Sequence, residues 1–173
     1  MESKAKILGH PAHPMLVVFP LGLLATAVVF DLIHLGTRNM QWSIAAYYMI
    51  AAGVIGALIA APFGAVDLMA VPRNTRARRI GAVHGAGNAV VVLLFAGSWA
   101  LRPAATVVPN DLALTLSFAG ASLAVVTAWL GGELVSRLGI GVSDTANVNA
   151  PSSLEGEPRE RRVDTSDPRT FPD

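Results

Sequence analysis

Five side chains that could do chemistry stand at the ends of long apolar stretches. They are three histidines and two carboxylates, namely His10, His13, Asp67, His84 and Glu133. Imidazole with carboxylate is a ligand set suited to zinc, manganese or non-haem iron, and metal sites in helix bundles are built from facing helices. An ionisable residue at membrane depth costs roughly 2.5 to 3.5 kcal/mol, so each needs a partner or a role. The sequence therefore predicts that these five residues bind a divalent transition metal.

Two other interpretations of the same residues stay open. His13 and His84 could instead be the axial ligands of a b-type haem, each from its own helix. Alternatively, the charged groups only satisfy their neighbours: Asp67 pairs with an arginine of the loop that follows it, Glu133 pairs with Arg137, and His84 donates to a backbone carbonyl. In that case the protein would be a structural or accessory membrane subunit.

The spacing of the histidines suggests which ones lie together. His10 and His13 flank Pro11, and prolines favour an extended polyproline-like lead-in whose three-residue turn places both imidazoles on one side. If the segment is instead the first helical turn, the spacing of three residues again places them together. Asp31 and His34 are also three positions apart, near the far end of the same apolar stretch. We expect these two to satisfy each other and assign them no role.

The elements that must position these residues are four long apolar segments. The chain is 53% hydrophobic and only 14% charged, whereas soluble proteins have about a quarter charged residues. A membrane-spanning helix needs about 20 apolar residues, because each residue adds about 1.5 Å and the hydrocarbon layer is about 30 Å thick. The pattern predicts four such helices, at about residues 14–35, 42–69, 78–101 and 112–136.

Short connections between these segments predict an all-α fold, a four-helix up-down transmembrane bundle. Seven Lys and Arg residues flank one side of the predicted spans and two flank the other. By the positive-inside rule, both termini then lie in the cytoplasm and the chain is a multi-pass protein of the inner (plasma) membrane. With this topology all five candidate ligands fall at the cytoplasmic end.

The whole sequence divides into two parts. Residues 1–143 form the transmembrane domain, and residues 144–173 are rich in Ser, Asn, Pro and mixed charge, which predicts a disordered cytoplasmic tail. Small residues recur every fourth position, as at Gly56, Ala60 and Gly64, and predict close helix packing. The expected partners are the lipid bilayer and either a second copy or another membrane protein. No nucleic-acid partner is expected, because the basic residues sit beside the spans.

No sequence motif assigns a reaction. The chain has no cysteine, which excludes disulfides, thiolate metal sites and cysteine nucleophiles. It also lacks a phosphate loop, a nucleophile elbow and a dinucleotide fingerprint. Enzymatic activity stays undecided and no catalytic residue is assigned. The three functional classes left are a cation-binding or redox module, a haem-binding electron carrier and an accessory subunit.

Two segments carry a resemblance to a known family. His10-Pro-Ala-His-Pro-Met-Leu-Val-Val-Phe-Pro-Leu-Gly22 and Trp129-Leu-Gly-Gly-Glu-Leu-Val-Ser-Arg-Leu-Gly-Ile-Gly-Val142 resemble bacterial membrane proteins grouped as domain of unknown function 2231. The resemblance covers about residues 8–143, and it implies a four-helix membrane domain without an established activity. Family members often have a histidine where this chain has Leu138, so the resemblance supports no ligand at that position.

Overall fold

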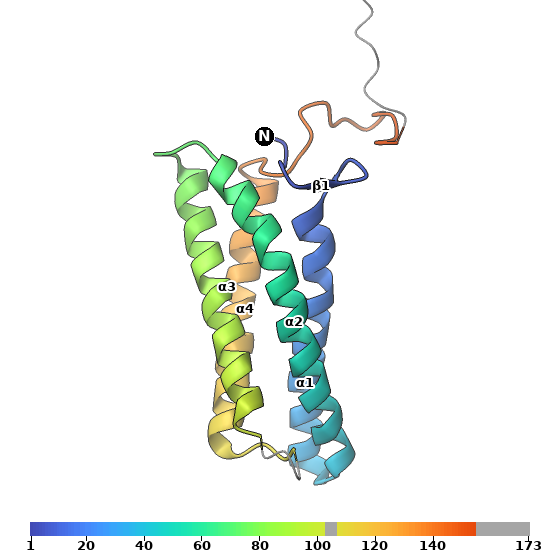
Figure 1. Cartoon of the computed structure of the whole chain (residues 1–173), viewed down its shortest axis with the longest axis vertical. Coiled ribbons are helices and arrows are strands. Elements are labelled where there is room, and N and C mark those ends of the chain that lie inside the picture. Colours follow the sequence, from blue (N-terminus) through green and yellow to red (C-terminus); the bar gives the residue numbers. More distant parts are fainter. Residues whose placement is uncertain (103–106, 155–173) are drawn as a thin grey trace, which may run out of the picture.

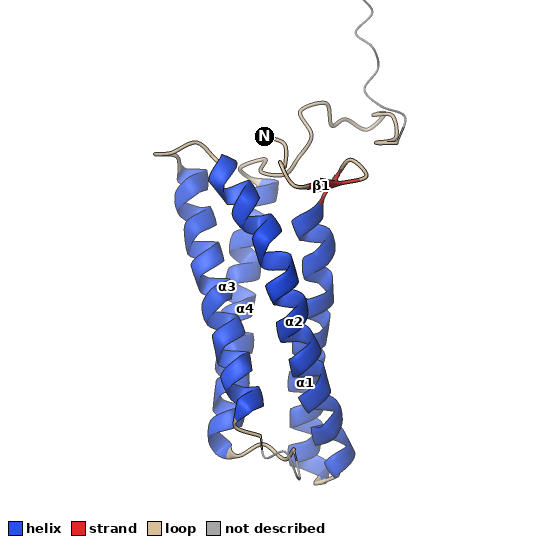
Figure 2. Ribbon diagram, in the orientation of Figure 1, coloured by secondary structure: helices blue, strands red, loops and turns tan. Residues whose placement is uncertain are grey.

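The computed structural model describes residues 1–102 and 107–154 (Figure 1). Its main elements are four long helices, as the secondary-structure colouring in Figure 2 shows. They are α1 (Ala12–Thr37), α2 (Met40–Ala70), α3 (Arg76–Ala100) and α4 (Asp111–Ser136). Two short strands, β1 (Lys6–Ile7) and β2 (His10–Pro11), precede them. The predicted all-α transmembrane bundle is confirmed, and each helix boundary lies within two residues of its predicted position.

Capping side chains explain where three of the helices begin. Asn39 precedes α2 and its side chain accepts a hydrogen bond from the backbone of Gln41. Thr75 caps α3, and Asn110 caps α4, by accepting bonds from backbone groups three positions later. Such caps satisfy amide groups that have no partner inside the first helical turn. The polar loop residues therefore fix the points at which the chain turns back into the apolar layer.

The four helices run alternately up and down and form two hairpins. Helix α1 packs mainly against α2, and α3 packs mainly against α4, with smaller contacts joining α2 to α3 and α1 to α4 (Figure 1). The largest buried core side chains come from both hairpins, for example Leu24 and Ile50 from the first and Val91 and Phe95 from the second. The beginning of α1, the α2–α3 loop and the end of α4 lie at one end of the bundle.

Each helix is long and apolar enough to cross a bilayer. The mean hydropathy of the most apolar window is 2.4 in α1, 2.1 in α2, and 1.7 in both α3 and α4. The shortest helix has 25 residues, or about 37 Å at 1.5 Å per residue, which exceeds the ~30 Å of hydrocarbon. Helix α1 continues through Pro20, and α2 continues through Pro62. Large apolar side chains on the outer faces then contact lipid.

The segment before α1 differs from the expected polyproline lead-in. Strands β1 and β2 pair antiparallel, and Leu8 and Gly9 between them have φ values of 50° and 83°. Because the helix begins directly after this small hairpin, His10 lies in β2 and His13 lies in α1. The expectation that the two imidazoles share one side of an extended segment was wrong. Residues 155–173, most of the predicted tail, lie outside the described residues.

Candidate site of paired histidines

His13 lies at the start of α1 and bonds to the next helix. Its Nδ1 is 3.1 Å from the carbonyl oxygen of Ala60 on α2. The ring also packs against Gly64, where an added Cβ would lie 3.0 Å from two ring atoms. The imidazole therefore lies in a notch on α2 that Ala60 and Gly64 form together.

His84 makes the same contacts in the second hairpin. Its Nδ1 is 2.8 Å from the carbonyl oxygen of Thr127 on α4. The ring packs against Gly131, where an added Cβ would lie 3.1 Å from Cε1. The alternative prediction that His84 bonds a backbone carbonyl is confirmed.

In both hairpins the glycine makes the bond possible. A helical carbonyl points toward the residue four positions later, so a side chain at that position would crowd an approaching donor. Gly64 follows Ala60, and Gly131 follows Thr127, by that interval. Sequence reasoning had assigned Gly64 to helix packing alone, whereas the structure uses it to seat an imidazole.

The hydrogen bonds show that Nδ1 of each ring carries a proton. A carbonyl oxygen only accepts, so each Nδ1 must carry the proton and, in the neutral ring, Nε2 keeps its electron pair. Metal-ligating histidines in proteins commonly donate their other ring N–H to a carbonyl or carboxylate in this way. The arrangement thus presents two oriented nitrogen donors.

Asn88 lies beside His84, with its amide nitrogen within hydrogen-bond distance of the ring. The amide nitrogen of Asn88 is 3.4 Å from Nδ1 and 3.2 Å from Nε2 of His84. Asn88 is held there because it donates to the His84 carbonyl at 2.9 Å and accepts from the Thr127 hydroxyl at 3.1 Å.

His13 and His84 are the histidines of α1 and α3. Both belong to the end of the bundle where α1 and α3 begin (Figure 1). Both side chains are half-buried. Of the five predicted ligands, these two are the pair whose Nδ1 atoms both bond a carbonyl of the following helix.

Asp67 instead holds the N-terminal segment in place. One of its carboxylate oxygens accepts from the backbone N–H of Lys4 at 2.7 Å and of Ala5 at 3.2 Å. The Ser3 hydroxyl lies 2.8 Å from both oxygens. The alternative prediction, an ion pair with a loop arginine, was therefore wrong, because backbone donors from the start of the chain reach this carboxylate.

Glu133 and His10 also have other contacts. Glu133 accepts from the Arg76 guanidinium at 2.6 Å, and not from Arg137 as one interpretation predicted. His10 is exposed, and its Nε2 lies 3.2 Å from the Ser153 hydroxyl. Within residues 1–102 and 107–154, no three His, Asp or Glu side chains are grouped closely enough to hold a metal ion. The predicted five-residue metal cluster is thus not assembled, because three of its members contact other groups.

The opposite end of the bundle contains a buried ion pair that the sequence analysis missed. Arg102 donates to both oxygens of Asp31, at 2.8 Å and 2.6 Å, and both side chains are fully buried. His34 bonds the Asn39 carbonyl at 2.9 Å, so the predicted Asp31–His34 pair was wrong. Arg102 is, with Arg38, one of the two basic residues that flank the less basic side of the predicted spans. From the sequence, Arg102 served only in the count of positive charges on each side of the membrane, so its contact with Asp31 was not predicted.

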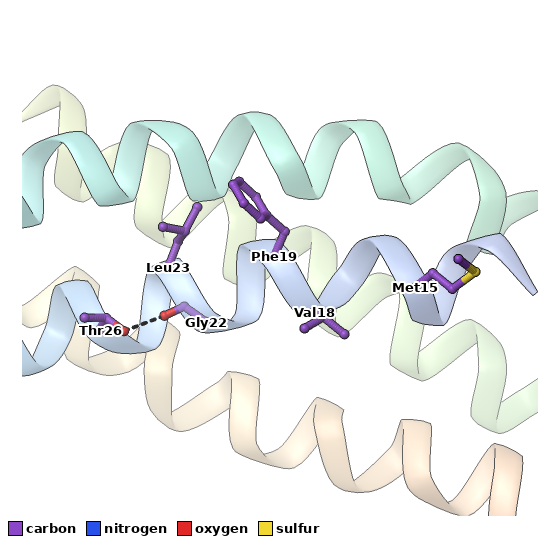
Figure 3. Close-up of a pocket in the computed structure, with 6 residues that line it drawn as sticks. All are labelled: Met15, Val18, Phe19, Gly22, Leu23 and Thr26. Atoms are coloured by element: carbon purple, nitrogen blue, oxygen red, sulfur yellow. Dashed lines mark hydrogen bonds between the residues drawn. The ribbon is translucent and has the colours of Figure 1, made fainter.

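Two surface hollows have linings that include neither histidine of the pair. One, of about 420 Å³, is an open groove on α1 around Gly22 (Figure 3). Its hydroxyl group, on Thr26, already donates to the Gly22 carbonyl at 2.8 Å. A second, of about 620 Å³, is lined by Arg73, Asn74, Arg78 and Arg79. The groove on α1 is apolar and suits lipid contact, whereas the arginine-lined hollow suits anions.

Comparison with known proteins agrees with this architecture. The family model described as "Predicted membrane protein (DUF2231)" matches residues 9–144, a segment that contains all four helices and both histidines of the pair. No curated protein and no solved structure matches the chain. The chain is therefore a multi-pass membrane protein that belongs to the DUF2231 family.

Proposed function

We propose that the protein binds a transition-metal centre through the Nε2 atoms of His13 and His84. The observation that carries this proposal is the shared geometry of the two rings, each donating Nδ1–H to a carbonyl of the following helix. Imidazole nitrogen suits zinc, copper, iron and nickel. The two histidines come from different hairpins, so one metal centre would join both halves of the bundle.

The surrounding charges favour a centre that needs few carboxylate ligands. Asp67 is occupied by donors from residues 3–5, and Glu133 is paired with Arg76. Two neutral imidazoles would therefore supply the protein ligands, and water or another small molecule would complete the coordination of a bare ion. The iron of a b-type haem also takes two axial imidazoles and is the second candidate.

The test is metal analysis with an absorption spectrum on detergent-purified protein, produced with either added metal salts or a haem precursor. We expect one metal per chain, lost in His13→Ala and in His84→Ala. His10→Ala is the matched control and retains the metal, because His10 is exposed and contacts Ser153. A Soret band would assign the centre to haem, and metal without a Soret band would assign it to a bare ion.

A negative result is equally clear. Wild-type protein with neither metal nor chromophore above trace, under every supplementation, would overturn the proposal. Equal metal content in wild type and in the His13→Ala, His84→Ala double variant would also overturn it. In both cases the accessory-subunit function would be the better explanation.

We also propose that the histidine end faces the cytoplasm in the inner membrane. Seven of the nine Lys and Arg residues that flank the spans belong to this end, which follows the positive-inside rule. Because the chain has no cysteine, single cysteines report topology cleanly. A membrane-impermeant maleimide applied to intact spheroplasts should label Gln41→Cys and spare Leu8→Cys, both of which are exposed positions. The reverse labelling pattern would invert the proposed orientation.

A further inference from the structure

The two hairpins share more than the histidine contacts. A shift of 71 positions takes Asp31 to Arg102, and the same shift takes His13 to His84. The two pairs lie at opposite ends of the bundle. One register therefore relates residues 13–31 to residues 84–102 at both of their ends.

Buried positions between these ends obey the same register. Leu24 corresponds to Phe95, and Ala27 corresponds to Ser98. All four side chains are buried, Leu24 at 7% exposure and the other three at 1% or less. Leu24 and Ala27 lie on the same face of α1 as His13 and Asp31, because spacings of 11, 14 and 18 residues are close to whole numbers of helical turns.

Helices α2 and α4 repeat one another in the same manner. The shift that takes Ala60 to Thr127 also takes Gly64 to Gly131 and Gly53 to Gly120. The last two glycines receive equivalent side chains. A Cβ added at Gly53 would lie 2.7 Å from Leu24, and one added at Gly120 would lie 3.0 Å from Phe95.

We infer that the domain is two copies of one helical hairpin around a pseudo-twofold axis, and that the metal centre lies on this axis with one equivalent imidazole from each copy. The axis runs along the bundle, because α1 and α3 start from the same end and lie diagonally opposite (Figure 1). At its other end the axis passes between Asp31 and Arg102, which are equivalent positions in direct contact.

A metal centre on the pseudo-twofold axis takes only certain kinds of metal or cofactor. The ligand must accept two chemically equivalent neutral nitrogen donors, as haem iron does through its two axial positions or as a bare metal ion does in a symmetric site. This part of the inference rests on the proposed function, whereas the repeat itself does not.

An exchange of the ion pair tests the repeat without any metal. The variant exchanges the charged residues by Asp31→Arg and Arg102→Asp. It also carries Ala27→Ser and Ser98→Ala, so that the hydroxyl beside the arginine moves to α1, where the arginine at position 31 then lies. In the native protein the Ser98 hydroxyl bonds the Ala113 carbonyl at 2.7 Å, and the equivalent acceptor for a serine at position 27 is Ala46. We expect Asp31→Arg alone and Arg102→Asp alone to lose folded, monodisperse protein, and the fourfold exchange to recover the wild-type unfolding midpoint.

Failure of the fourfold exchange to exceed the single variants would overturn the repeat. The shared metal centre is tested separately, by metal titration. The variants His13→Ala and His84→Ala should reduce the affinity for the metal by the same factor, within about threefold. Loss of binding in one variant with unchanged binding in the other would overturn the shared site on the axis. A wild-type protein that binds no metal, combined with a folded fourfold exchange, would reject the proposed function and leave the repeat standing.

Discussion

Asp31 and Arg102 form a bidentate ion pair in which both side chains have no exposed surface. Asp31 lies in α1 and Arg102 lies two residues after the end of α3, so the pair connects the two hairpins at the end opposite the histidines. Ser98 and Ser117 lie 3.5 Å and 3.4 Å from the same guanidinium nitrogen. The Nε of Arg102 has no hydrogen-bond partner among the described residues, so the guanidinium depends on Asp31 for compensation of its charge.

Removing one member of this pair should be strongly destabilising. In Asp31→Leu a guanidinium stays buried without its counter-charge, and breaking a buried ion pair in this way costs about 3–5 kcal/mol. The free energy of unfolding in detergent measures the change. Asp111→Ala is the control, because Asp111 is exposed at the same end of the bundle.

The double variant Asp31→Leu, Arg102→Leu should recover most of the loss, since replacing a buried pair with apolar residues is often neutral. A change below about 1 kcal/mol in Asp31→Leu alone would show that the pair does not hold the hairpins together.

Much of the fold was predictable because a membrane helix is specified mainly by the length of an apolar run in the sequence. Apolar length determines whether a segment spans the bilayer, and polar caps such as Asn39 and Thr75 mark the turns. These signals are local in the sequence. They were sufficient for the number of helices, their boundaries and the up-down topology.

The site was harder to predict because its contacts join distant segments. His13 bonds the backbone carbonyl of Ala60, and Asp67 bonds the backbone N–H of Lys4. Every residue type carries such backbone groups, so the sequence does not indicate which residue is the partner. Proximity in the sequence misled the prediction for Asp31, which is near His34 in the chain but pairs with Arg102. The available signal was the repeated interval between His13 and Asp31 and between His84 and Arg102.

Gly131→Ala should weaken metal binding through His84. The new Cβ would lie 3.1 Å from Cε1 of the ring, so the imidazole must turn away from the Thr127 carbonyl. Loss of such an orienting bond typically costs about 10- to 100-fold in metal affinity. Gly132→Ala is the matched control, since nothing lies within 4 Å of its added Cβ. Equal affinities of the two variants in a metal titration would contradict an orienting role for Thr127.

Glu133→Gln should change little, which distinguishes the two-histidine site from the original five-residue cluster. The Arg76 partner is 56% exposed, and such surface pairs contribute about 0–1 kcal/mol. We expect a stability change below about 1 kcal/mol and unchanged metal content. Metal analysis beside thermal unfolding provides both readouts. Loss of metal in this variant, with the fold intact, would return Glu133 to the ligand set.

Asp67→Leu should release the segment that crosses the histidine end of the bundle. The carboxylate accepts from Ser3, Lys4 and Ala5, and hydrogen bonds to a charged group contribute about 1.5–3 kcal/mol each. Trypsin cleavage after Lys4 should therefore be at least about tenfold faster than in wild type. Asp111→Leu at the other end serves as control. Unchanged cleavage would mean that other contacts hold the segment.

Acid should release the contact between Glu2 and the segment after α4. The Lys6 ammonium, the Ser143 hydroxyl at 2.8 Å and the backbone N–H of Asp144 lower the pKa of Glu2 from 4.5 to about 2. Because the folded-state pKa is the lower one, the stabilisation is complete above pH 4.5 and is lost as the pH falls toward 2. A fluorophore on Leu8→Cys should report increasing mobility of the N-terminal segment across this window. Glu2→Gln should already be mobile at neutral pH and show a smaller acid response, and an identical pH profile in both proteins would assign the transition to another group.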